Sequence, residues 1–220
     1  MAGMKSQSKA AALLLDVVGS RGDSRALRHE KLISAVDEVN GRVEALDPLR
    51  FTVGDELQGV YETLDGALRA AYALRLAVAP EVDLRAGIGI GEVKVIDVER
   101  GIQDGSAWWR AREAIDAVRD RASDAGYRGT RTAVVGVEEP LLEATVGLID
   151  AHLSGLRGGT VGTLRGLLEG LSNAEIAERE GISESANSQR VANNDLRPLA
   201  DAIRALTVFV TPSSPDAALE

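Results

Sequence analysis

Two aspartates in the first quarter of the chain have the side chains and the surroundings of a magnesium site. Asp16 directly follows the apolar residues 10–15, and Asp55 lies in the turn Gly54-Asp55-Glu56 between two β-prone segments. If these strands are neighbours, the two carboxylates face each other at one sheet edge. Proteins usually hold Mg²⁺ by one or two carboxylates while substrate phosphates complete the shell. We therefore predict Asp16 and Asp55 as ligands of Mg²⁺ or Mn²⁺.

Each aspartate alone also fits a structural role, because aspartate commonly caps helices and forms turns. Both together, in the right strand order, favour the metal. The residues after Asp16, which are Val17, Val18, Gly19 and Ser20, would offer backbone N–H groups to a phosphate chain. Arg112 would add positive charge from a helix. These five residues are the predicted nucleotide-binding set.

The elements that position these residues alternate between strand-like and helix-like patterns. The order β-α-β-β-α-β, with a further helix and strand, predicts an α+β fold with a ferredoxin-like antiparallel sheet and helices on one face. The other face is then free for a ligand. Alternating Gly87, Gly89 and Gly91 indicate a strand that something approaches closely. The expected strands cover residues 10–18, 51–53, 57–61, 84–90 with 93–96, and 132–137, and the helices cover 27–43, 64–78 and 107–122.

Strand signals stop after Glu138, which predicts two domains, 1–139 and 140–220, the second entirely helical. Gly158-Gly159 is the expected hinge, and residues 211–220 are an expected mobile tail. Within the second domain, Ser172 and Glu175 form a capping box before a short helix. Gly181 permits a sharp turn and Ser183 caps the next helix, which together predict a helix-turn-helix.

The second helix of this motif carries the side chains that could read base edges in a major groove. Asn187 occupies the position where the motif normally buries a valine, and a buried amide is costly unless it finds partners. Glu180 and Glu184 would repel phosphate. An alternative use of the motif is dimerisation, for which residues 196–209 form a plausible helix. The predicted DNA-binding residues are Ser183, Ser185, Ser188, Gln189 and Arg190.

Several motifs resemble known families. LLDVVGS at 14–20, TVGD at 52–55 and LRAGIGIGEV at 84–93 resemble motifs of class III nucleotidyl cyclases. More closely, DVVGSR at 16–21, GDELQG at 54–59, GIGIGE at 87–92 and WWRAREA at 108–114 resemble the SatD family. LSNAEIAEREGISESANSQRV at 171–191 is similar to the helix-turn-helix of sigma-factor region four. The resemblance implies a palm-like domain joined to a DNA-binding one.

The chain departs from the cyclases where charge would be stabilised during catalysis. Cyclases place an asparagine and an arginine on the helix after the fourth strand, and aligned on Gly105 those positions hold Trp109 and Glu113. An acid where the chemistry needs a cation disfavours turnover. Binding of a nucleotide is therefore predicted more strongly than its conversion.

Composition excludes other classes of site. The chain has no cysteine and only two histidines, which removes disulfides, zinc-thiolate sites, iron–sulfur clusters and a cysteine nucleophile. A net charge of -9 disfavours broad non-specific nucleic-acid binding, which depends on Lys and Arg. The first apolar run is too short to span a membrane. We expect a cytoplasmic protein without a membrane partner.

Together these patterns predict a homodimeric, DNA-binding transcriptional regulator whose cyclase-like domain binds a nucleotide-type ligand with Mg²⁺. One alternative is an enzyme, a nucleotidyl cyclase or nucleotidyltransferase with two-metal catalysis. Another is a vestigial palm that serves only as a dimerisation scaffold.

Overall fold

A computed structural model describes residues 9–19, 25–52, 54–98 and 100–208. The predicted tail, 211–220, and Ser20 lie outside these residues. The described part contains a five-stranded sheet in the order β2-β3-β1-β4-β7, in which β4 and β7 are parallel and the other pairs antiparallel. Its strands are β1 (Lys9–Val17), β2 (Asp47–Phe51), β3 (Leu57–Tyr61), β4 (Leu84–Glu92) and β7 (Thr132–Val135).

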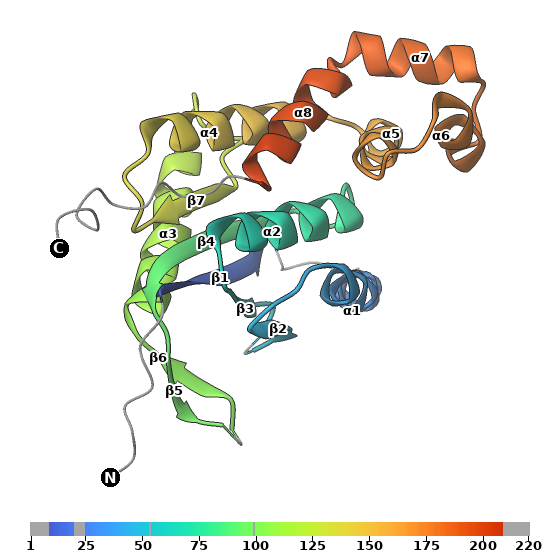
Figure 1. Cartoon of the computed structure of the whole chain (residues 1–220). Coiled ribbons are helices and arrows are strands. Elements are labelled where there is room, and N and C mark those ends of the chain that lie inside the picture. The colour runs from blue at the N-terminus through green and yellow to red at the C-terminus, as the bar shows by residue number, and fades with distance from the viewer. Residues whose placement is uncertain (1–8, 20–24, 53, 99, 209–220) are drawn as a thin grey trace, which may run out of the picture.

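The central strand β1 is apolar throughout because both of its faces are covered. Leu13 and Leu15 pack against α1 (Arg25–Arg42) and α2 (Leu64–Val78), whereas Ala12 and Leu14 pack against α3 (Ser106–Ser123). Figure 1 shows α1 and α2 on one side of the sheet and α3 on the other. The α+β class is confirmed. The expectation of a purely antiparallel sheet with helices on one face is wrong.

The reason lies in the alternating glycines of β4. A Cβ on Gly87 would lie 2.5 Å from the carbonyl oxygen of Ala111, and one on Gly89 would lie 2.1 Å from that of Ala107. The backbone of α3 therefore rests directly on β4. The close approach indicated by the glycine pattern is made by the chain's own helix, and this helix covers the face that was expected to be free.

A second, two-stranded sheet is formed by β5 (Lys94–Asp97) and β6 (Ile102–Asp104). This ribbon extends away from the main sheet (Figure 1). The sequence pattern joined 93–96 to the strand at 84–90, whereas the structure places Lys94–Asp97 in this separate sheet. The pattern did not predict β6, because three residues are too few to show periodicity.

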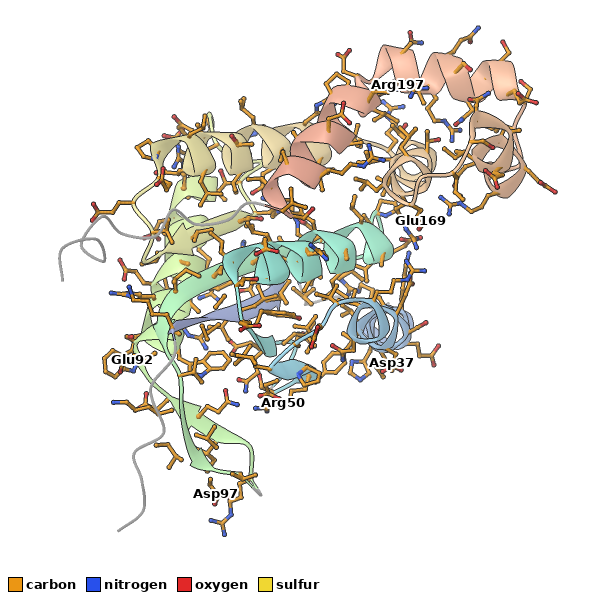
Figure 2. The ribbon with its side chains drawn as sticks, viewed as in Figure 1. Asp37, Arg50, Glu92, Asp97, Glu169 and Arg197 are labelled. Atoms are coloured by element: carbon orange, nitrogen blue, oxygen red, sulfur yellow. The ribbon has the colours of Figure 1, made fainter. Side chains whose placement is uncertain are left out.

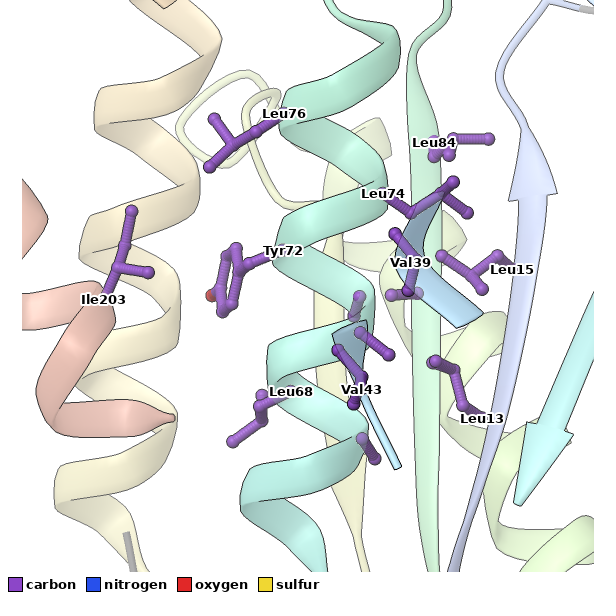
Figure 3. Packing of buried hydrophobic residues seen from close by; sticks show 14 of the residues in the cluster. Leu13, Leu15, Val39, Val43, Leu68, Tyr72, Leu74, Leu76, Leu84 and Ile203 are labelled. Atoms are coloured by element: carbon purple, nitrogen blue, oxygen red, sulfur yellow. The ribbon is translucent and has the colours of Figure 1, made fainter. Parts of the chain in front are cut away.

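The remaining helices pack onto the hydrophobic core formed by the sheet and α2. They are α4 (Pro140–Gly155), α5 (Gly158–Leu168), α6 (Asn173–Glu180), α7 (Glu184–Asn193) and α8 (Leu196–Leu206). Tyr72 and Leu76 project from the side of α2 that faces away from the sheet, toward Ile203 of α8 (Figure 3). One apolar cluster therefore runs from the sheet through α2 into α4 and α8.

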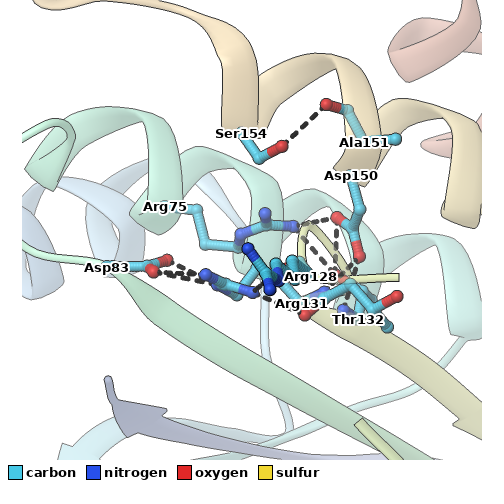
Figure 4. Close-up of polar contacts among 9 residues, drawn as sticks. Arg75, Asp83, Arg128, Arg131, Thr132, Asp150, Ala151 and Ser154 are labelled. Atoms are coloured by element: carbon cyan, nitrogen blue, oxygen red, sulfur yellow. Dashed lines mark hydrogen bonds and ion pairs between the residues drawn. The ribbon is translucent and has the colours of Figure 1, made fainter. Parts of the chain in front are cut away.

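A buried ion pair fixes α4 to α2, and hydrogen bonds of the same carboxylate fix α4 to β7 (Figure 4). Asp150 of α4 is fully buried, and its Oδ1 accepts hydrogen bonds from Arg75 Nη1 at 2.5 Å and Thr132 Oγ1 at 3.2 Å. Its Oδ2 accepts from the backbone N–H groups of Arg131 and Thr132. Burial is the largest single influence and would lower the pKa of Arg75, but the charge and hydrogen bond of Asp150, together with nearby Tyr72 and Asp83, outweigh it, and the pKa is raised. Every lone-pair direction of this carboxylate is thus used.

A hairpin surrounds Asp55 as predicted, but its first strand is Asp47–Phe51 and shares only Phe51 with the expected strand at 51–53, of which Val53 lies outside the described residues. The boundaries of α2 agree with the sequence prediction. Within the described ranges, no helix has both the length and the apolar character needed to cross a membrane.

Candidate functional site

Asp16 lies near the end of β1 on the face of the sheet that α3 covers. Its side chain follows Ala12 and Leu14 in the alternation of the strand and is 16% exposed. Arg119 of α3 donates to Oδ2 from Nη2 at 2.5 Å and from Nε at 3.2 Å, and Arg85 Nη1 lies 3.8 Å from the same oxygen. Hydrogen bonding to Asp16 raises the pKa of Arg119. The carboxylate is therefore neutralised by α3 and β4.

The other oxygen of this carboxylate is unsatisfied. Asp16 Oδ1 is buried and has no hydrogen-bond partner among the described residues. The Nε atom of Arg85, whose Nη1 lies 3.8 Å from Asp16 Oδ2, is also buried and without a hydrogen-bond partner among the described residues. Buried polar groups almost always have partners, so this unsatisfied oxygen is a candidate contact for a ligand, an ion or a water.

Glu56 is the second carboxylate at this edge. Leu15 pairs with Leu57, so Glu56 continues the register opposite Asp16. Arg112 of α3 binds Glu56 with both Nη atoms, at 2.8 and 2.9 Å, and this hydrogen bonding raises the pKa of Arg112. Arg112 and Arg119 stand two turns apart on one face of α3, and each of them holds one carboxylate.

Asp55 is adjacent to Glu56 in the turn between β2 and β3. The Thr52 N–H donates to the Glu56 carbonyl at 2.9 Å, and Gly54 adopts a φ of 76°, which a glycine accepts without strain. The structure thus brings Asp55 to the edge where Asp16 lies. Over the ranges that the structure describes, no three acidic or histidine side chains form a metal-binding group.

The segment predicted to bind phosphate, residues 17–20, is described only as far as Gly19. Val17 ends β1 opposite Leu84, and the Val18 N–H donates to the Asp83 carbonyl at 2.8 Å. Gly19 follows in a turn with a φ of 69°. The Val18 amide is therefore already used by the sheet, and the turn at Gly19 is the part of the segment that remains for a ligand.

The second candidate region is formed by α5, α6 and α7, and its predicted caps are confirmed. Ser172 and Glu175 form a reciprocal capping box, and the Ser183 hydroxyl accepts from the Ala186 N–H at 3.1 Å. Gly181 adopts the left-handed conformation between α6 and α7, with a φ of 66°.

The buried amide of Asn187 finds the partners that it needs. Asn187 is 1% exposed; its Oδ1 accepts from Thr163 Oγ1 of α5 and its Nδ2 donates to Asn173 Oδ1 of α6, both at 3.0 Å. A valine could make neither bond. The amide therefore ties three helices together, and α7 is rigidly oriented.

The predicted DNA-binding residues divide into two groups. Ser183, Ser185, Ser188 and Gln189 are exposed on or beside α7. Arg190 instead turns inward, where it donates to the Gly159 carbonyl at 2.7 Å and pairs with Glu180 at 3.4 Å. It holds α7 against α5 and is not part of the exposed face.

Sequence reasoning missed Arg119 and Arg85 beside Asp16. The available signal was the helical spacing of Arg112 and Arg119, which places both on one face of α3. Arg85 precedes the glycine-rich part of β4 and pairs across the sheet with Asp16.

A family model described as the SatD family matches residues 11–155. These residues include the carboxylates and arginines of the sheet edge and end at the last residue of α4. A search of curated proteins finds no match.

Proposed function

The chain belongs to the SatD family, and we propose that this member is a DNA-binding regulator whose sheet edge binds a nucleotide-type ligand with Mg²⁺. The observation that carries the DNA part is the exposed polar face of α7, held in one orientation by the buried Asn187. A recognition helix needs both properties: polar side chains that reach base edges and a support that fixes the helix.

The helix-turn-helix interpretation is supported by the order α6, left-handed Gly181, capped α7, as in the regulators that the motif resembles. Electrostatic attraction to phosphate is weak here, because Glu184 and Glu178 are exposed beside the motif. Arg197 at the start of α8 is an exposed cation on the same part of the molecule (Figure 2). A homodimer would compensate, since two half-sites act together.

The ligand part rests on the sheet edge. Asp16 and Asp55 would hold Mg²⁺, whose charge would polarise and orient the ligand's phosphates. The unsatisfied Oδ1 of Asp16 fits this role, because a hard cation prefers carboxylate oxygen. Arg119 and Arg112, which pair with Asp16 and Glu56, would turn to the phosphate oxygens. The carboxylates and arginines of the edge neutralise each other. A ligand that brings Mg²⁺ to the carboxylates and phosphate to the arginines would replace these internal pairs.

The proposal is that the sheet edge binds the nucleotide-type ligand without converting it. Trp109 is 66% exposed and donates to Asp104 Oδ1 at 3.0 Å, and Glu113 is exposed on the same helix. Neither residue supplies positive charge where a cyclase would need it. The enzymatic alternative thus has less support than ligand binding.

The test of the DNA function begins with selection of bound duplexes from a random-sequence pool at low salt. Fluorescence anisotropy then compares the chain with Gln189→Ala and Ser185→Ala, with Ser154→Ala on α4 as the control. Each lost base contact should weaken binding about 5- to 100-fold for the selected duplex only. Failure to enrich any sequence, or equal binding by all variants, contradicts the proposal and leaves the motif as a dimerisation element.

A further inference from the structure

A cavity of ≈ 280 Å³ lies between the helices that cover the sheet and the helices that follow it. It is bordered by α1 and α2 on one side and by α5 and α8 on the other, and Asp16 does not line it. Its apolar lining comes mainly from α2, where Ala73 and Ala77 are small residues one helical turn apart. The other core residues of the lining are Val39, Tyr72, Leu76, Leu168 and Ile203.

Each of the four bordering helices contributes one arginine to this cavity. They are Arg42 of α1, Arg69 of α2, Arg165 of α5 and Arg204 of α8, against two lining glutamates, Glu38 and Glu169. Glu169 lies at the end of α5 that faces α1 (Figure 2). Asp65 and Asp201, outside the lining, pair with Arg69 and Arg204, so each of the four arginines has a carboxylate partner.

The ion pairs of Arg42 and Arg165 lie at the partly exposed rim of the cavity, and two of them are long. Arg165 lies 3.7 Å from Glu38, and Arg42 lies 4.0 Å from Glu169 and 2.9 Å from Glu38. The side chains of Arg42 and Arg165 are 63% and 35% exposed. Exposed pairs of this kind contribute at most about 1 kcal/mol, so a guanidinium can exchange its carboxylate for a ligand anion.

We propose that this four-arginine cavity binds a small organic anion, with a compact apolar body of ring size and a carboxylate, sulfonate or phosphate group. The apolar floor would take the body, as in most small-molecule sites, and the arginines at the rim would hold the charge. The volume is close to the lower end of the range for such sites, about 300–1,000 Å³, which favours a small ligand. This site is separate from the sheet edge.

An occupant would contact the sheet-covering helices and the helices that position α7 at once. It would therefore stabilise their present arrangement, by the same mass action that links any native-state ligand to stability. An effect on DNA binding rests on the function proposed above, whereas the binding of the anion does not. The experiment is accordingly a binding measurement without DNA.

The probes are 8-anilinonaphthalene-1-sulfonate and N-phenyl-1-naphthylamine, which has the same ring system without the sulfonate. Their fluorescence is titrated with the full chain and with three variants. Ala73→Leu fills the floor, Arg165→Gln removes one rim charge, and Arg157→Gln is a matched arginine change outside the cavity. Ala77→Leu replaces Ala73→Leu if the latter does not melt cooperatively.

The sulfonate should bind at least tenfold more tightly than the neutral probe. Ala73→Leu should weaken both probes at least tenfold, Arg165→Gln should weaken only the sulfonate, and Arg157→Gln should change neither. Equal affinity for the two probes, or no effect of Ala73→Leu and Arg165→Gln, overturns the proposal. So does a tenfold gain in sulfonate affinity for Phe209→Ala, which would assign the cavity to the chain's own C-terminal segment.

Discussion

The guanidinium of Arg119 and the carboxylate of Asp16 are joined through one oxygen only. Arg119 donates twice to Oδ2, while Oδ1 of the same carboxylate is buried and unsatisfied. This ion pair joins β1 and α3, which are far apart in the sequence, and leaves Oδ1 of Asp16 without a hydrogen bond to any described residue. This arrangement suits a carboxylate that is held in place before a cation arrives.

Removal of Arg119 should therefore strengthen metal binding and weaken nucleotide binding. In Arg119→Ala the competing cation is lost, so Mn²⁺ alone should raise the Tm more than it does in the unaltered chain. The added shift from a nucleoside triphosphate should shrink, because a phosphate partner is gone. Thermal unfolding with and without each ligand measures both effects.

Two variants make this result specific. Asp16→Asn should abolish the Mn²⁺ shift, and Arg121→Ala, which removes an exposed arginine on the same helix paired with Glu143, should leave both shifts unchanged. Identical shifts in Asp16→Asn and the unaltered chain would show that the metal, if bound, is bound elsewhere.

Asn187→Ala should destabilise the chain by about 1–3 kcal/mol, because the Thr163 hydroxyl loses a buried partner. Asn187→Val combined with Thr163→Val should recover part of this loss, since replacing both partners by apolar groups is nearly neutral. Urea denaturation measures the free energy of unfolding. If the double variant loses at least as much unfolding free energy as Asn187→Ala, this account of the network is contradicted.

Gly89→Ala should destabilise the fold strongly, because the added Cβ would lie 2.1 Å from the Ala107 carbonyl. Overpacking of this kind costs about 1–3 kcal/mol or more. The control is Gly41→Ala in α1, where a Cβ meets nothing within 4 Å and a helical alanine gains about 0.5–1 kcal/mol. The unfolding free energy should fall for Gly89→Ala and rise for Gly41→Ala. Equal changes in the two variants would mean that α3 lies farther from β4 than described.

Asp150→Ala should cost about 3–5 kcal/mol, because it leaves the buried guanidinium of Arg75 without its counter-charge. Adding Arg75→Met should restore much of this stability, since an apolar pair replaces a desolvated ion pair at little cost. Denaturation of the three variants under identical conditions tests the pair. If the double variant is no more stable than Asp150→Ala, the charge is not the cause.

Acid should loosen the start of α6. Hydrogen bonds from Ser172 hold the pKa of Glu175 below its usual value, so the ionised form is favoured in the folded helix. This contribution is complete above the unfolded pKa of 4.5 and disappears as pH falls through the lower folded pKa. Hydrogen exchange at the Ser172 amide should speed up over that range beyond the intrinsic pH effect, and Glu175→Gln should not show the change.

Local chemistry explains what could be predicted from the sequence. The caps at Ser172 and Ser183 and the turn at Gly181 depend on neighbouring residues, so their spacing is sufficient evidence. The same holds for the hairpin around Asp55, where strand-forming segments flank a turn.

What could not be predicted depends on contacts between distant segments. The partner of Asp16 is Arg119, and no local pattern shows which arginine of α3 reaches it. The glycines of β4 indicated a close neighbour but not its identity, which is α3. Arg190 shows the same limit: its helical position indicated an exposed edge, but Gly159 and Glu180 draw it inward.

The bonds of Asp150 also bear on how this family could vary. The family match ends at Gly155, the last residue of α4, and Asp150 binds that helix to α2 and β7. The segment after α4 could therefore be replaced as a unit without breaking these bonds, provided that the apolar face of α8 that packs against α2 is retained. A junction before Pro140 would instead separate Asp150 from Arg75 and leave a charge buried in each half.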